Sequence, residues 1–224
     1  MNKKNYLADD KYRMNYEVFT PETFKKNLPL IIFLHGAGER GTVVEHLGRH
    51  GIPLMLEKGF ETEAVILCPQ CPGDCVWDNI PWEVKALIDR VIDEYDVDRT
   101  RVSLTGGSMG GFGTWMIGLT FPNFFSAIAP VAGGGMSWRC SNLSTTPVHA
   151  YHGSADTAVP LVYSQLMVDS VIKNGGKATL TVLDGYDHCG GINTAYQQYG
   201  VVDWLLSQQR TDFTPIPEAL SFYY

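Results

Sequence analysis

Val102-Ser103-Leu104-Thr105-Gly106-Gly107-Ser108-Met109-Gly110-Gly111 is the stretch that decides the fold. An apolar strand pattern leads into it, and a helical pattern from Met109 to Leu119 follows it. The segment contains G-x-S-x-G, and a serine on a sharp strand-to-helix turn needs small residues two places before and two places after it. Because the motif stands between a strand and a helix, we favour a nucleophilic Ser108 over an ordinary glycine-rich turn.

Outside this stretch, short apolar runs alternate with helical patterns, which is typical of an α/β fold with a mostly parallel sheet. The strand runs after Leu30 are continuously apolar, as expected where helices cover both faces of the sheet. The clearest helix begins at Pro81 and places apolar residues at helical spacing as far as Tyr95. The other expected strands cover Tyr16–Phe19, Leu30–Leu34, Ala64–Cys68, Ala127–Val131, Val148–Tyr151 and Leu180–Leu183, and the other helices Leu161–Lys173 and Thr194–Ser207.

A serine nucleophile needs a base and an acid that orients the base. Among the six histidines, His188 alone lies on a polar, glycine-flanked loop after the last expected strand, so we predict it as the base. Asp156 follows the strand that ends near Tyr151, at the edge where open α/β sheets build their sites, and we predict it as the acid. Asp184 and Asp187 are the alternatives for the acid. Both are close to His188 in the sequence, so their side chains reach its Nδ1 with difficulty while its Nε2 faces Ser108.

The reaction also needs backbone N–H groups that hold the oxyanion without reorganising. We expect one from Met109, directly after the nucleophile at the helix N-terminus. The other should come from the glycine-rich loop after Leu34, where Ala37 is preferred and Gly36 or Gly38 are alternatives. In the same loop, His35 is expected to be a structural histidine.

Composition limits the remaining function classes. The chain has 224 residues, 45% of them apolar and 18% charged, so we expect a single domain, 1–224, with residues 1–11 as an N-terminal extension and 211–224 as a tail packed on the body. A formal charge of -7 gives no electrostatic reason to bind nucleic acid. The longest apolar runs are far shorter than the ~20 residues of a membrane span. Residues 1–10 carry no apolar signal-peptide core.

Five cysteines are an odd number in a chain of this size, which favours a reducing compartment, the cytoplasm, unless a removed signal peptide directed secretion. Two alternatives stay open for the group formed by Cys68, Cys71 and Cys75. A metal site is the weaker one, because structural zinc needs four ligands and no second ligand pair follows, so no metal is expected. A disulfide between Cys71 and Cys75 is the stronger one.

Four segments, taken together and in this order, resemble the α/β-hydrolase superfamily, and more narrowly its feruloyl-esterase-like and predicted-peptidase branch, related to dienelactone hydrolases and acyl-protein thioesterases. They are Leu34–Gly41, Asp98–Gly111, His152–Pro160 and Asp187-His188. The resemblance extends over nearly the whole chain. It implies an α/β-hydrolase fold and a serine carboxylesterase with no cofactor, with Ser108 as nucleophile, Asp156 as acid and His188 as base. Dienelactone hydrolases use a cysteine nucleophile, so Ser108 argues against that activity.

The resemblance also suggests residues that bind the substrate. The segment containing Gln70 looks like the branch's proline-glutamine loop, and Trp77 follows it at a place that borders the pocket in such esterases. Lids in this superfamily follow the strand expected at Ala127–Val131, and the interval 132–147 is too short for a helical lid domain. Trp138 in this interval is expected to form a shallow apolar wall with Met136 and Met109.

The expected substrate is therefore a small-molecule ester with a short or aromatic acyl group. A peptidase or an acyl-thioesterase is the alternative within the same fold, because the same machinery attacks amides and thioesters. An inactive binding module on a hydrolase scaffold is the alternative from another class. The oligomeric state does not follow from the sequence.

Overall fold

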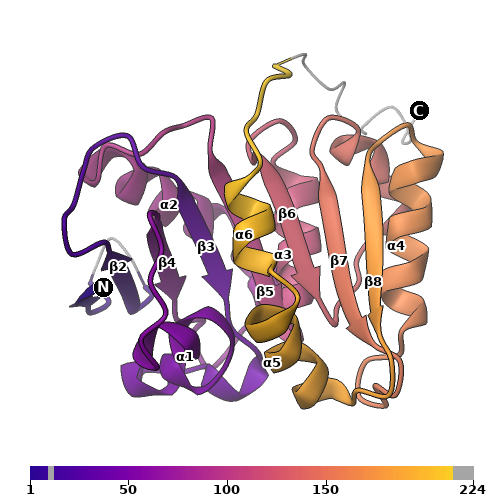
Figure 1. Ribbon diagram of the computed structural model, residues 1–224, viewed down its shortest axis with the longest axis horizontal. Helices are drawn as coiled ribbons and strands as arrows, with labels where there is room; N and C mark the ends of the chain where they lie inside the picture. Colours follow the sequence, from indigo (N-terminus) through magenta and orange to yellow (C-terminus); the bar gives the residue numbers. More distant parts are fainter. Residues whose placement is uncertain (10–12, 214–224) are drawn as a thin grey trace.

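The computed structural model describes residues 1–9 and 13–213 and is built around one eight-stranded sheet with the order β1-β2-β4-β3-β5-β6-β7-β8 (Figure 1). The first two strands are antiparallel to their neighbours, and the other pairs are parallel. The strands are β1 (Asn2–Tyr6), β2 (Tyr16–Thr20), β3 (Leu30–Leu34), β4 (Val65–Pro69), β5 (Val102–Gly107), β6 (Ala127–Val131), β7 (Val148–Gly153) and β8 (Ala178–Leu183). The predicted α/β class with a mostly parallel sheet is confirmed.

Helices cover both faces of this sheet, as Figure 1 shows. One face packs against α2 (Pro81–Glu94), α3 (Met109–Thr120) and α4 (Val162–Lys173). The other packs against α1 (Gly51–Glu57), α5 (His188–Gln198) and α6 (Val201–Leu206). Short 3-10 helices complete the connections: η1 (Ala37–Glu39), η2 (Val44–Arg49), η3 (Trp77–Asn79) and η4 (Ser137–Leu143).

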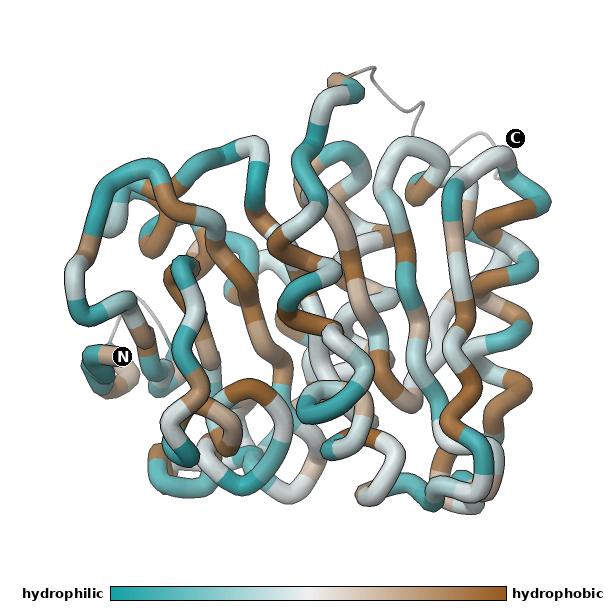
Figure 2. The backbone as a smooth tube through the Cα atoms, in the orientation of Figure 1, coloured by the Kyte–Doolittle hydropathy of each residue, from teal (hydrophilic) through white to brown (hydrophobic). Residues whose placement is uncertain are grey.

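The two apolar layers explain the continuous apolar strands. In β3, Leu30, Ile32 and Leu34 point into one layer, while Ile31 and Phe33 point into the other. Figure 2 shows the same pattern, with brown central strands beneath helices whose outer sides are teal. Alternate side chains of a strand point to opposite faces, so a strand covered on both faces is apolar at most of its positions.

The N-terminal residues differ from the expected extension, because Asn2–Tyr6 pairs with Tyr16–Thr20 as the edge strand β1. Four of its five side chains are exposed, so the strand has no apolar alternation that sequence analysis could detect. Its pairing with β2 and an ion pair between Lys3 Nζ and Glu17 at 2.7 Å hold it in place. At the other end, residues 214–224 of the expected tail lie outside the described residues.

The last predicted helix, Thr194–Ser207, is two helices in the structure. Helix α5 begins earlier, at His188, because the Asp187 side chain caps it by accepting a hydrogen bond from Gly190 N at 2.7 Å. It ends before Gly200, whose φ of 65° lies in the left-handed region and turns the chain into α6. Sequence analysis also missed α1. The segment before α1 forms η2, which holds His46, and His50 occupies the N-cap position of α1.

Candidate active site

Ser108 lies on the sharp turn between β5 and α3, with φ 58° and ψ -120°. This backbone conformation is strained for a residue other than glycine, and such strain concentrates at functional sites. The turn is possible because the neighbouring backbone comes very close. A Cβ on Gly110 would lie 1.9 Å from Leu34 O, and one on Gly106 would lie 2.5 Å from the same atom. The need for glycine two places before and after the serine therefore has a direct structural reason.

The structure brings Ser108, His188 and Asp156 together from three separate segments. His188 Nε2 lies 2.8 Å from Ser108 Oγ, and His188 Nδ1 lies 2.6 Å from Asp156 Oδ2. A carboxylate only accepts hydrogen bonds, so Nδ1 carries the proton and the lone pair of Nε2 faces the serine hydroxyl. This arrangement can activate a hydroxyl group as a nucleophile.

The Asp156 carboxylate is completely buried and well supplied with donors. Its Oδ1 accepts hydrogen bonds from the backbone N–H groups of Ala158 at 2.9 Å and Val159 at 2.8 Å, and Oδ2 accepts from His188. The rival carboxylates have other partners, since Asp187 caps α5 and Asp184 accepts a hydrogen bond from Ser154. His188 differs from the predicted loop position, because it is the first residue of α5.

A second histidine, His152, lies next to Asp156, and sequence analysis did not assign it to the site. The buried His152 has its Nε2 at 2.8 Å from Val159 O and at 3.4 Å from Asp156 Oδ2, and its Nδ1 at 2.7 Å from Ser164 Oγ. Burial lowers the pKa of His152, so the ring is neutral, and the carbonyl of Val159 places its proton on Nε2. The same ring thus ties the turn that carries Asp156 to α4. The only signal in the sequence was its place four residues before Asp156.

The residues predicted for the oxyanion site lie beside Ser108. Met109 is the first residue of α3, where backbone N–H groups have no acceptor within the helix. Ala37 begins η1 and, with Gly36 and Gly38, lines the same cavity as Ser108 and His188. A Cβ on Gly36 would lie 3.6 Å from Ser108 Cβ, so this loop passes directly over the serine.

Gln70 and Trp77, expected to contact the substrate, are fully buried and instead support this loop. Gln70 Nε2 donates to Glu39 O at 2.9 Å and to Val43 O at 2.7 Å, which fixes both ends of the connection between η1 and η2. Trp77 Nε1 donates to His35 O at 3.0 Å. The sequence alone does not show whether a polar side chain near a site faces the ligand or holds the backbone in place.

His35 has the structural role expected for it. Its Nδ1–H donates to Gly36 O at 2.6 Å, and its Nε2 accepts from Cys71 N at 2.9 Å. Burial lowers its pKa to about 4, so the imidazole is neutral near pH 7. The ring therefore connects the loop after β3 to the loop after β4.

Comparisons with known proteins agree with this geometry. No protein-family model matches the sequence. The chain is similar to a thermostable esterase of known structure, with a TM-score of 0.79 and 27% identity, covering 93% of this chain and 63% of that one. The chain has the α/β-hydrolase fold.

Two curated proteins are also similar to this chain. The bifunctional acetylxylan esterase/xylanase XynS20E of Neocallimastix patriciarum is 29% identical over 176 residues, which is 76% of this chain and 25% of that protein. Poly(3-hydroxyalkanoate) depolymerase C of Paucimonas lemoignei is 26% identical over 149 residues, 59% of this chain and 34% of that protein. The chain thus spans about a quarter and a third of the length of these relatives.

The cavity beside Ser108 has a volume of about 260 Å³. Phe33, which precedes Ser108 in the sequence, and Ile192, which follows it, form the apolar wall of this cavity. Trp138, predicted to form this wall with Met136, lies on the connection after β6 with its side chain about half exposed, and it does not line the cavity. The residues that line it are Phe33, Gly36, Ala37, Gly38, Glu39, His50, Gly107, Ser108, His188, Cys189 and Ile192.

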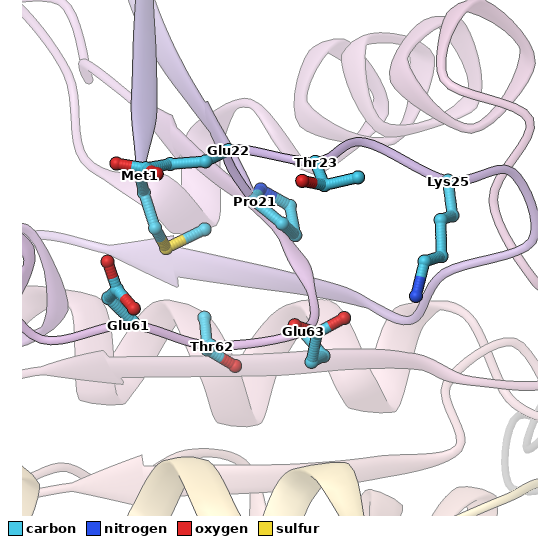
Figure 3. Close-up of a pocket in the computed structure, with 8 residues that line it drawn as sticks. All are labelled: Met1, Pro21, Glu22, Thr23, Lys25, Glu61, Thr62 and Glu63. Atoms are coloured by element: carbon cyan, nitrogen blue, oxygen red, sulfur yellow. The ribbon is translucent and has the colours of Figure 1, made fainter.

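A second hollow of about 290 Å³ lies at the opposite edge of the sheet, between the start of β1 and the segment that leads into β4 (Figure 3). Glu61, Glu63 and Lys25 line it with the side chain of Met1. The carboxyl ends of the parallel strands, where α/β proteins build their sites, are at the other edge. This hollow therefore has no part in the chemistry at Ser108.

The cysteines form neither a disulfide nor a metal site within the described residues. Cys71 Sγ and Cys75 Sγ lie 3.9 Å apart, well beyond the ~2.05 Å of a disulfide bond, and all five thiols are free. Burial raises the pKa of the Cys71 and Cys68 thiols. In residues 1–9 and 13–213, no group of three or more His, Cys, Asp or Glu side chains is placed to hold a metal ion.

None of the helices in residues 1–9 and 13–213 has the length and apolar character that crossing a bilayer requires.

Proposed function

We propose that this α/β hydrolase is a serine carboxylesterase in which Ser108 is the nucleophile, His188 the general base and Asp156 the acid that orients His188. The observation that carries the proposal is the continuous pair of hydrogen bonds, 2.8 Å from Ser108 Oγ to His188 and 2.6 Å from His188 to Asp156. The names of the thermostable esterase, the acetylxylan esterase/xylanase and the depolymerase support ester hydrolysis as the reaction.

In the proposed first half-reaction, His188 Nε2 takes the proton of Ser108 as Oγ attacks the ester carbonyl carbon. The carbonyl oxygen becomes an oxyanion and accepts hydrogen bonds from the N–H groups of Ala37 and Met109. The bond from carbon to the alkoxy oxygen then breaks, and the imidazolium gives its proton to that oxygen. An alcohol leaves and an acyl-enzyme remains.

In the second half-reaction, His188 takes a proton from water, which attacks the acyl-enzyme. The tetrahedral intermediate collapses, Ser108 Oγ leaves and recovers its proton from His188, and the carboxylic acid product is released. Asp156 keeps its negative charge throughout and stabilises the imidazolium. The residues on this path supply the nucleophile, the proton transfers and the oxyanion site.

The size of the cavity supports a short acyl or aromatic acyl substrate. Its volume of about 260 Å³ is below the ~300–1,000 Å³ typical of sites for drug-sized ligands. Phe33 and Ile192 give it an apolar wall that suits the hydrocarbon part of a small ester.

Replacing the nucleophile tests the proposal. Ser108→Ala should lower kcat for 4-nitrophenyl acetate by about 10⁴-fold or more, because the base then has no hydroxyl to activate. Ser207→Ala removes an exposed hydroxyl at the end of α6 and should leave kcat unchanged. A Ser108→Ala enzyme that keeps most of its kcat, with unchanged circular dichroism, would disprove the assignment.

Two further measurements separate the alternatives. A fluorophosphonate should label the protein at Ser108, and failure to form this adduct would favour a binding module without activity. The ratio of kcat/KM values for an aryl ester, an acyl-thioester and a peptide separates an esterase from an acyl-thioesterase or a peptidase.

A further inference from the structure

Glu39 places a carboxylate in the wall of the cavity beside Ser108. The residue is only 3% exposed, although most glutamates are at the surface of proteins. A Cβ on Gly36 would lie 3.3 Å from Glu39 Oε2 and 3.6 Å from Ser108 Cβ. The carboxylate and the serine therefore lie on two sides of one glycine.

This carboxylate lacks a hydrogen-bond donor among the described residues. The nearest nitrogens are His35 Nδ1 and His50 Nε2, both at 3.7 Å, which is beyond hydrogen-bond distance. His35 is already occupied, because its Nδ1–H donates to Gly36 O and its Nε2 accepts from Cys71 N. Glu39 lines the cavity, so a donor group of a ligand bound there can form a hydrogen bond with this carboxylate.

His50 lies on the same side of the cavity as Glu39. Its Nε2 is 3.7 Å from Glu39 Oε1, and its Nδ1 is 3.4 Å from Asn193 Oδ1. A hydroxyl group both donates and accepts hydrogen bonds, so it can donate to the Glu39 carboxylate while it exchanges a second hydrogen bond with the imidazole.

We propose that Glu39 and His50 form a subsite for a hydroxyl group of the ester substrate and thereby determine its specificity. The inference rests on the proposed esterase function. The hydroxyl group belongs either to the acyl part, as in a hydroxyacyl ester, or to the alcohol part, as in a partly acylated sugar. Both sources present the same O–H donor to Glu39.

Paired substrates test the subsite. The acyl pair is 4-nitrophenyl 3-hydroxybutyrate and 4-nitrophenyl butyrate, and the alcohol pair is a monoacetylated methyl xyloside and cyclohexyl acetate. In one pair, the unmodified enzyme should have at least about tenfold higher kcat/KM for the hydroxylated member, and this pair identifies the source of the hydroxyl group. Glu39→Leu should lower kcat/KM for that member roughly 10- to 100-fold and leave its partner within about threefold.

Three further variants accompany this test. Glu39→Gln keeps the shape but loses the charge and should give an intermediate loss for the hydroxylated ester, while His50→Ala should give a smaller loss in the same direction. Glu45→Leu removes an exposed carboxylate from the neighbouring η2 and should change neither member of a pair. Equal losses for both members of each pair in Glu39→Leu, or no preference for a hydroxyl group in the unmodified enzyme, would overturn the subsite while leaving the esterase function intact.

A binding measurement tests the subsite separately from catalysis. The Ser108→Ala variant and the double variant Ser108→Ala/Glu39→Leu are each titrated calorimetrically with methyl 3-hydroxybutyrate, methyl butyrate and methyl xyloside. A hydroxylated ligand should bind more weakly to the double variant than to Ser108→Ala. If the unmodified protein hydrolyses none of the four esters, the proposed function fails, and this titration alone decides the subsite. Unchanged binding of every ligand overturns it.

Discussion

At the scale of single residues, hydrogen bonds between buried groups hold the site in place. Asp156 is satisfied by backbone N–H groups and by His188, and the buried rings of His35 and His152 act as neutral connectors. A neutral imidazole has one donor and one acceptor, so each ring can link two fixed backbone or side-chain groups. These rings hold the loops that carry Ala37 and Asp156 in place beside Ser108.

Burial of His35 makes the stability of the protein depend on pH. Its pKa is about 4 in the folded protein and about 6.5 when unfolded, so between these values only the unfolded chain binds the proton. The free energy of unfolding should therefore fall as the pH is lowered from about 6.5 to about 4, with His35 contributing about 3 kcal/mol over this interval.

Urea unfolding at several pH values measures this effect in the natural protein and in His35→Gln. The difference between the two slopes isolates His35 from His149 and His152, whose pKa values burial also lowers. Identical slopes in the two proteins would mean that His35 is accessible to protons in the folded state.

At the scale of elements, the 3-10 helix η1 is too short to hold its own shape. It contains three residues, Ala37–Glu39, and side chains of residues outside it bind each of its carbonyl groups. Arg40 and Arg49 bind those of Ala37 and Gly38, and Gln70, from the end of β4, binds that of Glu39. The position of the proposed oxyanion donor is thus set by residues that do not line the cavity beside Ser108.

Gln70→Leu should therefore reduce catalysis without removing any group from the cavity. It leaves the carbonyls of Glu39 and Val43 without a donor, at a cost of about 1–3 kcal/mol, which corresponds to several degrees in Tm. We expect kcat to fall by roughly tenfold while KM changes little, because a displaced N–H weakens the oxyanion more than the bound ester.

Steady-state kinetics and thermal unfolding check this expectation, and Gln165→Leu, an exposed glutamine on α4, is the matched control. An increase in KM with unchanged kcat would instead support the direct substrate contact that the sequence suggested for Gln70.

At the scale of the whole molecule, the sheet runs across the protein from the edge strand β1 to the edge strand β8. The first of these is attached by backbone pairing and by the ion pair of Lys3 with Glu17. The Glu17 side chain is 1% exposed, and burial raises its pKa. A buried carboxylate without a partner would lower the free energy of unfolding. The register of β1 places Lys3 beside Glu17, so this register depends on the charge of Lys3.

Lys3→Met should destabilise the protein, toward the lower end of the ~3–5 kcal/mol for breaking a buried pair, because Lys3 is a third exposed. Adding Glu17→Leu should restore most of this stability, since replacing both partners with apolar groups removes the unpaired charge. Chemical denaturation of the two variants measures both effects. A double variant that is less stable than Lys3→Met alone would show that the ion pair does not control the attachment of β1.

What the sequence by itself determined follows from local rules. The apolar strands, the helix from Pro81 and the turn around Ser108 were predictable because periodicity and close backbone packing act between near neighbours in the chain. The order of Ser108, Asp156 and His188 was also predictable, since strand ends of a parallel sheet meet at one edge. Tertiary structure alone decided the rest. Burial separated Gln70 and Trp77 from the cavity, pairing made residues 2–6 a strand, and the approach of Glu39 to Ser108 across Gly36 arose from packing between segments far apart in the sequence.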